Sequence, residues 1–426
     1  MKSFEELITK EENNKMVLLN PNNLHWVKMK KALYDKKCSS SEEEEQLINY
    51  LDEKYDLFQG KRTHVEEANI KSIYFSITNK CNMSCPFCSM NSGPDVSRKK
   101  DLSLKEIRKI VIPKIKKINP RKIVVSGGEP LVREDIKEIL QMFSESFGKE
   151  RVVLQTNGLL MNDDILGNIK DYISGIEFSV EYIFDNEALL KRMENIFKSV
   201  ISNDLVLAFS FVIDEDTRRN LIKAIDLGHK YDAIFTMRVV SQVGRAAEQS
   251  NDKYKYGSDF ILDTYYEVAK HIVENRYFNE NISSVFLNEI HPKRHCGAYG
   301  NVISIRPNGD TRMCSNFKDL KFSMGSIIEN SAEDIMNKLN QKLQDEEFVE
   351  FFCVDAKKMC KDCEIKYFCS GPCAAEIAEN SENIDEIEEK CVSRRILTKY
   401  SMFYYDKKES DEINLKNFLT YIEAVR

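Results

Sequence analysis

Six short runs rich in β-branched and aromatic residues alternate with amphipathic helical stretches between residues 71 and 240, and this alternation constrains the fold most. The expected strands are Ser72–Thr78, Lys122–Val125, Arg151–Gln155, Ile176–Val180, Leu205–Val212 and Ile234–Val240. Strands separated by helices form parallel sheets with right-handed crossovers. Because six units are too few for a closed eightfold barrel, the sequence predicts an α/β fold built on an open, partial (β/α)6 barrel.

Apolar residues at helical spacing predict helices in the segments between these strands. The expected helices are Leu104–Ile118, Glu134–Phe147, Asp163–Ile169, Glu187–Ile201 and Thr217–Lys230. A longer stretch of the same kind, Asp259–Arg276, predicts a helical connector after the barrel.

Three cysteines follow the first expected strand at the spacing C-x3-C-x2-C, as Cys81, Cys85 and Cys88. In barrels of this kind the functional groups gather at the carboxyl ends of the strands, and this loop leaves such an end. Three thiolates on one tight loop suit three irons of a [4Fe–4S] cluster and leave the fourth iron open for another ligand.

The ends of later strands carry groups suited to a small polar ligand. Gly127 and Gly128 let the backbone approach a ligand closely, and the Glu129 carboxylate can accept a hydrogen bond from an ammonium group. The segment Thr156-Asn157-Gly158 offers small polar groups, and Arg245 offers a planar fork that pairs with carboxylates. Their shared position at one end of the sheet, rather than any single motif, favours a binding site.

Composition bounds the class of protein and its compartment. The chain has 426 residues and a net charge of −7, and its pI of about 5.7 argues against nucleic acid as the main partner. The longest apolar run, Leu205 to Ile213, is too short to cross a bilayer, and the N-terminus lacks the apolar core of a signal peptide. A cytoplasmic protein is therefore expected, in which clusters among the twelve cysteines indicate metal ligation rather than disulfides.

A second group of cysteines occupies the C-terminal part of the chain. Cys296 and Cys314 flank an expected hairpin whose turn is Pro307-Asn308-Gly309-Asp310, so that the hairpin brings the two cysteines near each other. The remaining members are Cys360, Cys363, Cys369, Cys373 and Cys391. Pairs at C-x2-C spacing bind zinc as well as iron–sulfur clusters, and spacing alone does not separate the two.

The loop at Cys81–Cys88 and the segment Gly127–Pro130 together resemble the radical S-adenosylmethionine (SAM) enzymes. The resemblance implies that Cys81, Cys85 and Cys88 are the catalytic cluster ligands and that SAM binds the open iron through its amino and carboxylate groups. The cofactor-binding candidates are Phe87 near the adenine, Gly127, Gly128, Glu129 and Pro130 at the methionine end, and Asn157, Ser179 and Arg245. Many relatives have aspartate where this chain has Glu181, so Glu181 is given no role.

The C-terminal cysteines resemble the SPASM extension found in one branch of that family, which carries two auxiliary [4Fe–4S] clusters. The resemblance implies that Cys296, Cys314 and Cys373 ligate the first cluster, and that the second is ligated by Cys360, Cys363, Cys369 and Cys391. With three cysteines, one iron of the first cluster is either open or filled by Cys353, His295 or another group. Cys353 and Cys38 are otherwise plain buried thiols.

The N-terminal part of the chain predicts a small α+β unit. Strands around Asn20-Pro-Asn-Asn and a helix capped near Ser39–Ser41 resemble, in topology only, the winged-helix-like modules that bind leader peptides. The alternative is a simple extension packed on the core. The expected domains are a leader-recognition module at 1–66, a radical SAM core at 67–255, a helical connector at 256–295, and a SPASM domain with a C-terminal helix at 296–426.

These resemblances predict an enzyme of peptide maturation. The leading hypothesis is a maturase that links a cysteine sulfur to a carbon of a precursor peptide carrying a leader, supplied with electrons by a flavodoxin- or ferredoxin-type reductant. An open auxiliary iron suits a substrate thiolate as its ligand. Alternatives are carbon–carbon crosslinking, formylglycine formation in a sulfatase, and a non-catalytic iron–sulfur or zinc protein that transfers electrons or binds a peptide.

Overall fold

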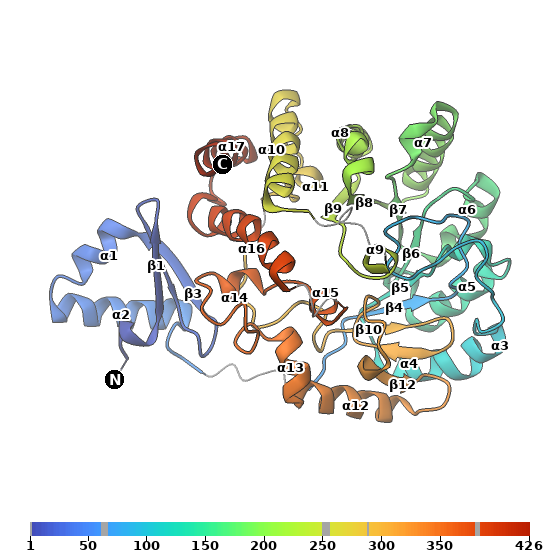
Figure 1. The fold of residues 1–426 in the computed structure, drawn as a ribbon, viewed down its shortest axis with the longest axis horizontal. Helices are drawn as coiled ribbons and strands as arrows, with labels where there is room; N and C mark the ends of the chain where they lie inside the picture. The colour runs from blue at the N-terminus through green and yellow to red at the C-terminus, as the bar shows by residue number, and fades with distance from the viewer. Residues whose placement is uncertain (1, 61–66, 249–255, 288, 380–383) are drawn as a thin grey trace.

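The computed structural model describes residues 2–60, 67–248, 256–287, 289–379 and 384–426. The expected domain boundaries near residues 66 and 255 therefore lie outside the described residues. Within them, one nine-stranded sheet runs through most of the molecule in the order β12-β11-β10-β4-β5-β6-β7-β8-β9 (Figure 1).

Six parallel strands form the expected partial barrel, which confirms the predicted fold class. They are β4 (Ser72–Ser76), β5 (Lys122–Ser126), β6 (Val152–Thr156), β7 (Gly175–Ser179), β8 (Val206–Ile213) and β9 (Ile234–Val239). The side chains that face the helices are buried, among them Ile73, Val125 and Phe178. Those facing the lumen are more polar, so the interior of the barrel is open to a ligand instead of being filled.

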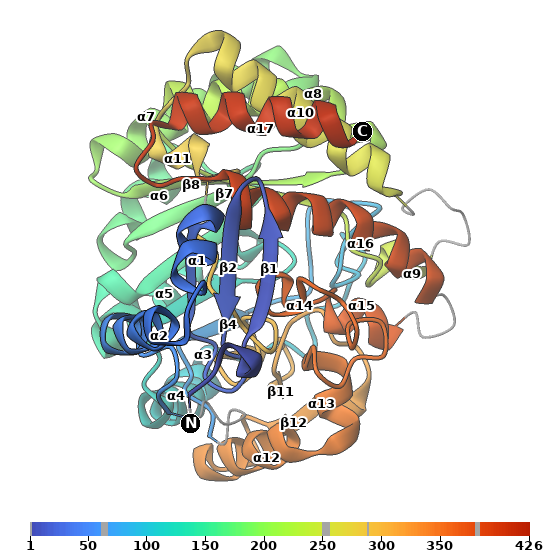
Figure 2. The same cartoon turned by 90° about the vertical axis from the view of Figure 1, so that its left-hand side faces the viewer.

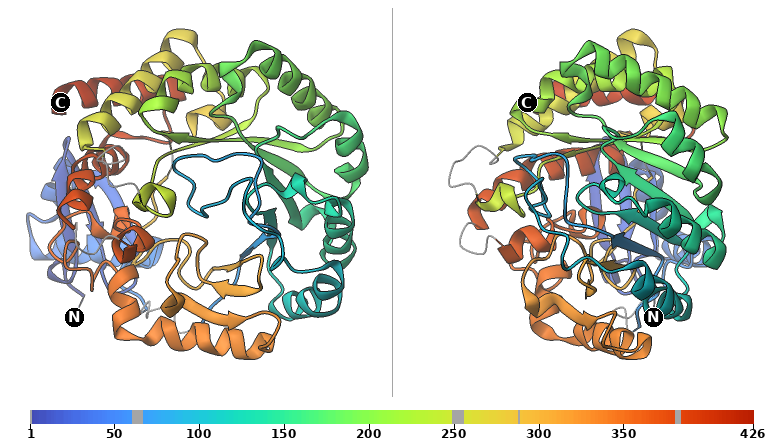
Figure 3. Two further views of the ribbon diagram at one scale, coloured as in Figure 1. Left: turned by 45° about the vertical axis from the view of Figure 1, so that its right-hand side comes forward. Right: turned by 90° about the vertical axis from the view of Figure 1, so that its right-hand side faces the viewer.

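Helices cover the outside of this sheet (Figure 3). They are α3 (Leu104–Glu106), a π-helical turn (Ile107–Val111), α4 (Ile112–Ile118), α5 (Ile136–Phe147), α6 (Asp163–Ile169), α7 (Glu187–Ser202), α8 (Glu215–Lys230), α10 (Ser258–Asn275) and α11 (Glu280–Ser283). The short helix α9 (Arg245–Glu248) lies instead beside the cysteine loop, where the Arg245 N–H donates to the Cys88 carbonyl. Side-chain caps begin several of the outer helices; Asn162 accepts from the Ile165 N–H at 2.8 Å, and Asn186 accepts from the Leu189 N–H at 2.9 Å.

The C-terminal hairpin forms as predicted, but it joins the barrel instead of standing apart. Strand β10 (Val302–Ile305) pairs with β11 (Asp310–Arg312), which pairs with β12 (Ser323–Ser326). The other edge of β10 runs parallel to β4 and extends the barrel sheet. Nothing in the local sequence indicated this pairing, because it joins strands more than two hundred residues apart.

Further helices complete the C-terminal part. They are α12 (Ala332–Gln344), α13 (Glu346–Phe352), α14 (Lys366–Cys369), α15 (Ala374–Glu379), α16 (Ile384–Lys399) and α17 (Asp411–Val425). Both α16 and α17 pack on α10, which links this region to the barrel. No helix in the described segments has the length and apolar character that a membrane span requires.

The N-terminal unit is a three-stranded antiparallel sheet with two helices, in agreement with the predicted α+β module. Its elements are β1 (Ile8–Glu12), β2 (Lys15–Leu19), β3 (Trp26–Lys30), α1 (Lys31–Lys37) and α2 (Ser41–Tyr55). Strand β1 was not predicted, because Thr9 to Glu12 are polar and offer no apolar alternation. The unit lies against the C-terminal region, away from the barrel (Figures 1 and 2). Trp26 meets Phe368 edge-on at 5.1 Å, and Lys28 Nζ donates to the Tyr405 carbonyl at 2.7 Å.

Candidate functional site

A cavity of about 790 Å³ fills the barrel lumen at the carboxyl ends of the strands. Cys81, Cys85 and Cys88 line it from the loop after β4, as the sequence predicted. Cys314 lines the same cavity from the loop after β11. A single space therefore connects the first cysteine loop with the C-terminal cysteine region.

The cysteine loop is anchored by the backbone that follows β5. The Gly128 N–H donates to the Thr78 carbonyl at 2.8 Å, and the Glu129 N–H donates to the Lys80 carbonyl at 2.9 Å. A Cβ atom on Gly128 would lie 2.4 Å from the Lys80 carbonyl oxygen, so only glycine fits there. Gly127 and Gly128 do line the cavity, but the close approach that requires glycine is to the loop, not to a ligand.

The Glu129 carboxylate does not reach the cavity. It is fully buried and accepts hydrogen bonds from Thr156 Oγ1 at 2.7 Å, the Asn157 N–H at 2.8 Å and the Leu131 N–H at 2.9 Å. Burial raises its pKa, and these three donors favour the ionised form. The sequence suggested that this carboxylate accepts a hydrogen bond from a ligand's ammonium group. That expectation is corrected, because its oxygens accept from groups of the protein and so connect the end of β5 with the end of β6. Pro130 is also buried and starts a short 3-10 helix.

Arg245 holds the cysteine loop and does not face a ligand. Its N–H donates to the Cys88 carbonyl at 3.0 Å, and its guanidinium donates to the carbonyls of Cys85 and, at 2.6 Å, Ser92. Gly244 packs so closely that a Cβ there would lie 2.5 Å from the Cys88 carbonyl oxygen. The predicted pairing of Arg245 with a ligand carboxylate is therefore replaced by a clamp on the loop backbone.

Three of the other predicted residues do face the cavity. Phe87 lines it and stacks on Tyr182 with ring centroids 6.2 Å apart and planes 8° apart. Ser179 is exposed to the cavity at the end of β7. Asn157 also lines it, and its Nδ2 donates to Asn82 Oδ1 at 2.8 Å. The aromatic pair and the two small polar groups provide an apolar surface beside hydrogen-bonding positions.

Side chains on the lumen face of the strands complete the cavity and were missed in the sequence. They include Tyr74 on β4, Gln155 on β6, Glu177 on β7 and Arg238 on β9. Gln155 Nε2 donates to Glu177 Oε1 at 3.0 Å, and burial followed by the charge of Glu177 raises the pKa of Tyr74. The alternation of each strand could have indicated them, since each lies one position from a buried apolar residue.

The electrostatics of the C-terminal cysteines divide them into two sets. Burial raises the pKa of Cys314 to about 12, with smaller contributions from Cys373 and Cys296. Burial likewise raises the pKa of Cys360 to about 11, and among the smaller contributions are the charges of Cys369, Cys391 and Cys363. These groups have the same members as the two ligand sets that the family resemblance implies, and their binding of clusters stays a prediction. Cys353 interacts instead with Asp355, Arg294 and Tyr299.

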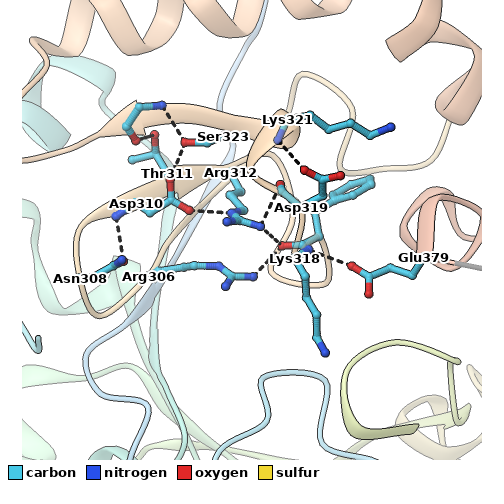
Figure 4. A network of polar contacts seen from close by, with 12 residues as sticks. Arg306, Asn308, Asp310, Thr311, Arg312, Lys318, Asp319, Lys321, Ser323 and Glu379 are labelled. Atoms are coloured by element: carbon cyan, nitrogen blue, oxygen red, sulfur yellow. Dashed lines mark hydrogen bonds and ion pairs between the residues drawn. The ribbon is translucent and has the colours of Figure 1, made fainter. Parts of the chain in front are cut away.

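A network of polar contacts holds the loop that carries Cys314 (Figure 4). Arg312 is buried; its Nε donates to Asp310 Oδ2 at 2.6 Å, and its Nη1 donates to the carbonyls of Phe317 at 2.6 Å and Asp319 at 3.1 Å. Arg306 Nη2 also donates to the Phe317 carbonyl, at 2.6 Å. The two arginines thus fix the backbone that follows Cys314.

The donor set on the first loop fits a cluster with thiolate ligands. The N–H groups of Met83 and Ser92 point at the sulfurs of Cys81 and Cys88, each at 3.4 Å, and such donors stabilise negative charge on cluster sulfurs. Burial raises the pKa of Cys85 to about 12, so binding of iron must displace its proton. In the segments that the structure describes, no three Cys, His, Asp or Glu side chains converge as the ligands of a single metal ion do.

Comparison with known proteins identifies two regions of the chain. The sequence model of the radical SAM superfamily matches residues 75–237, and that of the SPASM iron–sulfur cluster-binding domain matches residues 296–364. The radical SAM cyclopropyl synthase TigE of Paramaledivibacter caminithermalis is 25% identical over 393 residues, covering 80% of this chain and 77% of the synthase.

Two further similarities concern a shorter match and a similar fold. A GTP 3′,8-cyclase of Mannheimia succiniciproducens is 34% identical over 128 residues, which are 30% of this chain and 37% of the cyclase. The structure of Streptococcus suis SuiB bound to precursor peptide SuiA superposes with a TM-score of 0.54 at 14% identity, covering 88% of this chain and 96% of SuiB. The last similarity shows that the two chains share a fold.

Proposed function

The chain is a radical SAM enzyme with a SPASM domain, using [4Fe–4S] clusters and SAM, and we propose that it forms thioether bonds in a ribosomally made precursor peptide. In this proposal a cysteine sulfur of the peptide is joined to a carbon of another residue. Residues 1–66 form the leader-recognition module, 67–255 the radical SAM core, 256–295 the connector and 296–426 the SPASM region.

One observation carries the proposal: the two cysteine regions share a cavity. Cys81, Cys85 and Cys88 line it on one side and Cys314 on the other. When bound, the cluster and SAM supply a radical that removes a hydrogen atom from substrate, and an auxiliary cluster accepts the electron left behind. The chain supplies the geometry. Phe87 and Tyr182 provide the face for an adenine, and Ser179 and Asn157 provide polar contacts for SAM.

The set of Cys296, Cys314 and Cys373 supports a sulfur-containing substrate. Cys353 has Asp355, Arg294 and Tyr299 as neighbours, and these contacts favour an open iron over ligation by Cys353. Cys296, Cys314 and Cys373 would hold a cluster with one iron free to bind the thiolate of a substrate cysteine, and Cys314 lines the cavity. Arg312 and Arg306 keep the Cys314 loop at the cavity wall.

The N-terminal unit supports a peptide as the substrate. Its sheet has the order β1-β2-β3, so strands β1 and β3 each have an edge that an extended leader segment can join. SuiB, which shares the fold, has been solved with a precursor peptide bound. An external reductant of the flavodoxin or ferredoxin type completes the proposed set of partners.

The test separates SAM cleavage from crosslinking. The holoenzyme is reconstituted anaerobically and incubated with a cysteine-containing peptide encoded beside its gene. Mass spectrometry should show a loss of two hydrogens per bond and block of thiol alkylation. Cys314→Ala and Cys296→Ala should abolish crosslinking while 5′-deoxyadenosine is still formed, and Cys38→Ala serves as the control. Undiminished crosslinking in Cys314→Ala refutes the thioether proposal.

A second candidate is carbon–carbon bond formation. The similarity to a cyclopropyl synthase over 80% of this chain favours it. The same experiment distinguishes the two reactions, because carbon–carbon chemistry removes hydrogen from the peptide and leaves every thiol open to alkylation.

A further inference from the structure

A buried lysine lies between the two C-terminal cysteine sets. Lys357 is 3% exposed, and its Nζ donates to the Pro372 carbonyl at 2.9 Å. A Cβ atom on Gly371 would lie 3.1 Å from Lys357 Nζ and 3.2 Å from Cys360 Sγ, so the ammonium group and this sulfur border the same small space. The ammonium group thus touches the turn that leads from Cys369 to Cys373.

This turn is where the chain passes from one cysteine set to the other. Ser370 and Gly371 both have positive φ, at 62° and 73°, which bends the chain sharply between Cys369 and Cys373. The Gly371 carbonyl accepts from Arg394 Nη1 at 3.1 Å, while the adjacent Pro372 carbonyl accepts from Lys357. Two cations therefore hold the junction of the two sets.

The negative charges around Lys357 come from cysteine sulfur. Burial lowers the pKa of this lysine, and the positive charge of the Arg394 guanidinium lowers it further. The negative charges of Cys360, Cys296 and Cys373 oppose this lowering of the pKa. Cys360 belongs to one set, whereas Cys296 and Cys373 belong to the other. Among the salt bridges of the described segments, none joins Lys357 to a carboxylate. A buried cation needs a compensating negative charge, and the thiolates of both sets are the groups placed to supply it.

We propose that Lys357, with Arg394 beside it, is an electrostatic link between the two auxiliary clusters that raises their reduction potentials. The inference rests on the ligand sets of the proposed function. A fixed positive charge at low dielectric stabilises the state of a cluster that holds one more electron. With the clusters bound, the cysteines of the two sets would hold groups able to accept the single electron that hydrogen abstraction and bond formation leave over, and a one-electron carrier of the flavodoxin or ferredoxin type would take it up. Lys357 does not line the cavity and acts through the cysteine sulfurs, so it is a positioning residue.

The test measures potentials on the holoenzyme. Lys357→Met removes the charge and retains the volume, while Lys357→Arg retains the charge. The neighbouring Lys358 is exposed, and Lys358→Met is the matched control. In redox titrations followed by electron paramagnetic resonance, Lys357→Met should shift the auxiliary potentials to more negative values at unchanged iron and sulfide content. Lys357→Arg and Lys358→Met should remain at the wild-type values, as should the SAM-binding cluster in every variant.

Unchanged auxiliary potentials in a fully loaded Lys357→Met protein overturn the link. If that variant loses iron, Arg394→Gln takes its place. The Arg394 guanidinium donates to the Gly371 carbonyl at the same turn, so its loss should shift the potential of the cluster bound by Cys391, and no shift there overturns the link too. Wild-type protein that binds only one auxiliary cluster refutes the ligand sets themselves. This outcome differs from an unchanged potential in either variant.

Discussion

The two three-cysteine sets are assembled by different means, and of the second set Cys314 lines the cavity that the first set lines. Cys81, Cys85 and Cys88 lie on one loop, whereas Cys296, Cys314 and Cys373 come from the segment before β10, the end of β11 and the start of α15. The first set is made by local sequence, and its loop is fixed by backbone contacts with the segment after β5 and by the Arg245 guanidinium. The second exists only because β10 pairs with β4 and the turn at Gly371 returns the chain.

The two cysteine loops are also held in place by different groups. The loop of Cys81–Cys88 is held by Gly128, Arg245 and the buried Arg133, whose Nη1 donates to the Ile77 carbonyl at 2.9 Å. The Cys314 loop is held by side chains, chiefly Arg312 and Arg306. Damage to the first set should stop radical formation, and damage to the second should uncouple radical formation from product.

The largest expected effect comes from removing one ligand of the first set. Cys85→Ser should abolish SAM cleavage completely, because the cluster loses one of its three protein ligands, whereas Cys314→Ser should retain it. Quantifying 5′-deoxyadenosine by chromatography checks this. Equal losses in the two variants contradict the division of roles between the two sets.

The next effect concerns the support of the second set. Arg312→Gln removes the donors to Phe317 and Asp319, so the Cys314 loop should loosen and crosslinking should fall about 10- to 100-fold, as for other partners of metal ligands. SAM cleavage should stay at the wild-type level. Arg306→Gln, which removes a single donor to Phe317, should have a smaller effect, and the product is measured by mass spectrometry.

A smaller effect is expected on stability where the first loop meets β5. Gly128→Ala places a methyl group against the Lys80 carbonyl and should destabilise the protein by about 2 kcal/mol. Gly167→Ala in α6 meets no atom within 4 Å and should stabilise it by about 0.5 kcal/mol or more. Urea unfolding of the metal-free protein gives both values. If Gly128→Ala leaves the free energy of unfolding unchanged, the close approach of Gly128 to the Lys80 carbonyl does not require glycine.

The smallest effect concerns how the free energy of unfolding depends on pH at the Arg133–Asp135 ion pair. The Arg133 guanidinium donates to both oxygens of Asp135, at 2.8 and 2.7 Å, and holds the pKa of that carboxyl below its ordinary value. A depressed pKa adds stability above the ordinary value, and this stability is lost as the pH falls through the folded-state pKa. Asp135→Asn should therefore cost about 1 kcal/mol at pH 7 and progressively less below about pH 4.

Urea unfolding of the metal-free protein at pH 7 and pH 3 measures this difference. Asp171→Asn, at an exposed position, is the control and should show no such change. A cost for Asp135→Asn that is equal at both pH values assigns the effect to packing instead of charge.

Much of the barrel was predictable because its signals are local. Runs of β-branched and aromatic residues between helical stretches located six strands to within about two residues, and the C-x3-C-x2-C loop indicated an open iron. Residues that act through contacts distant in sequence were not predictable. Arg245 was expected to meet a ligand and clamps the carbonyls of Cys85 and Ser92 instead. The lumen residues Tyr74 and Arg238 were overlooked although strand alternation could have indicated them, whereas their gathering around one cavity depends on how the strands are arranged in the barrel.

The sequence by itself determined the chemistry: thiols at cluster spacing, glycines where the chain must approach itself, and helices and strands in alternation. The tertiary structure alone decided which groups meet. It turned the Glu129 carboxylate inward to Thr156 and Asn157, brought Cys314 to the radical-forming cavity, and placed Lys357 between two cysteine sets. Spacing along a chain fixes which ligands are available, whereas burial and long-range strand pairing fix their neighbours and hence their charge.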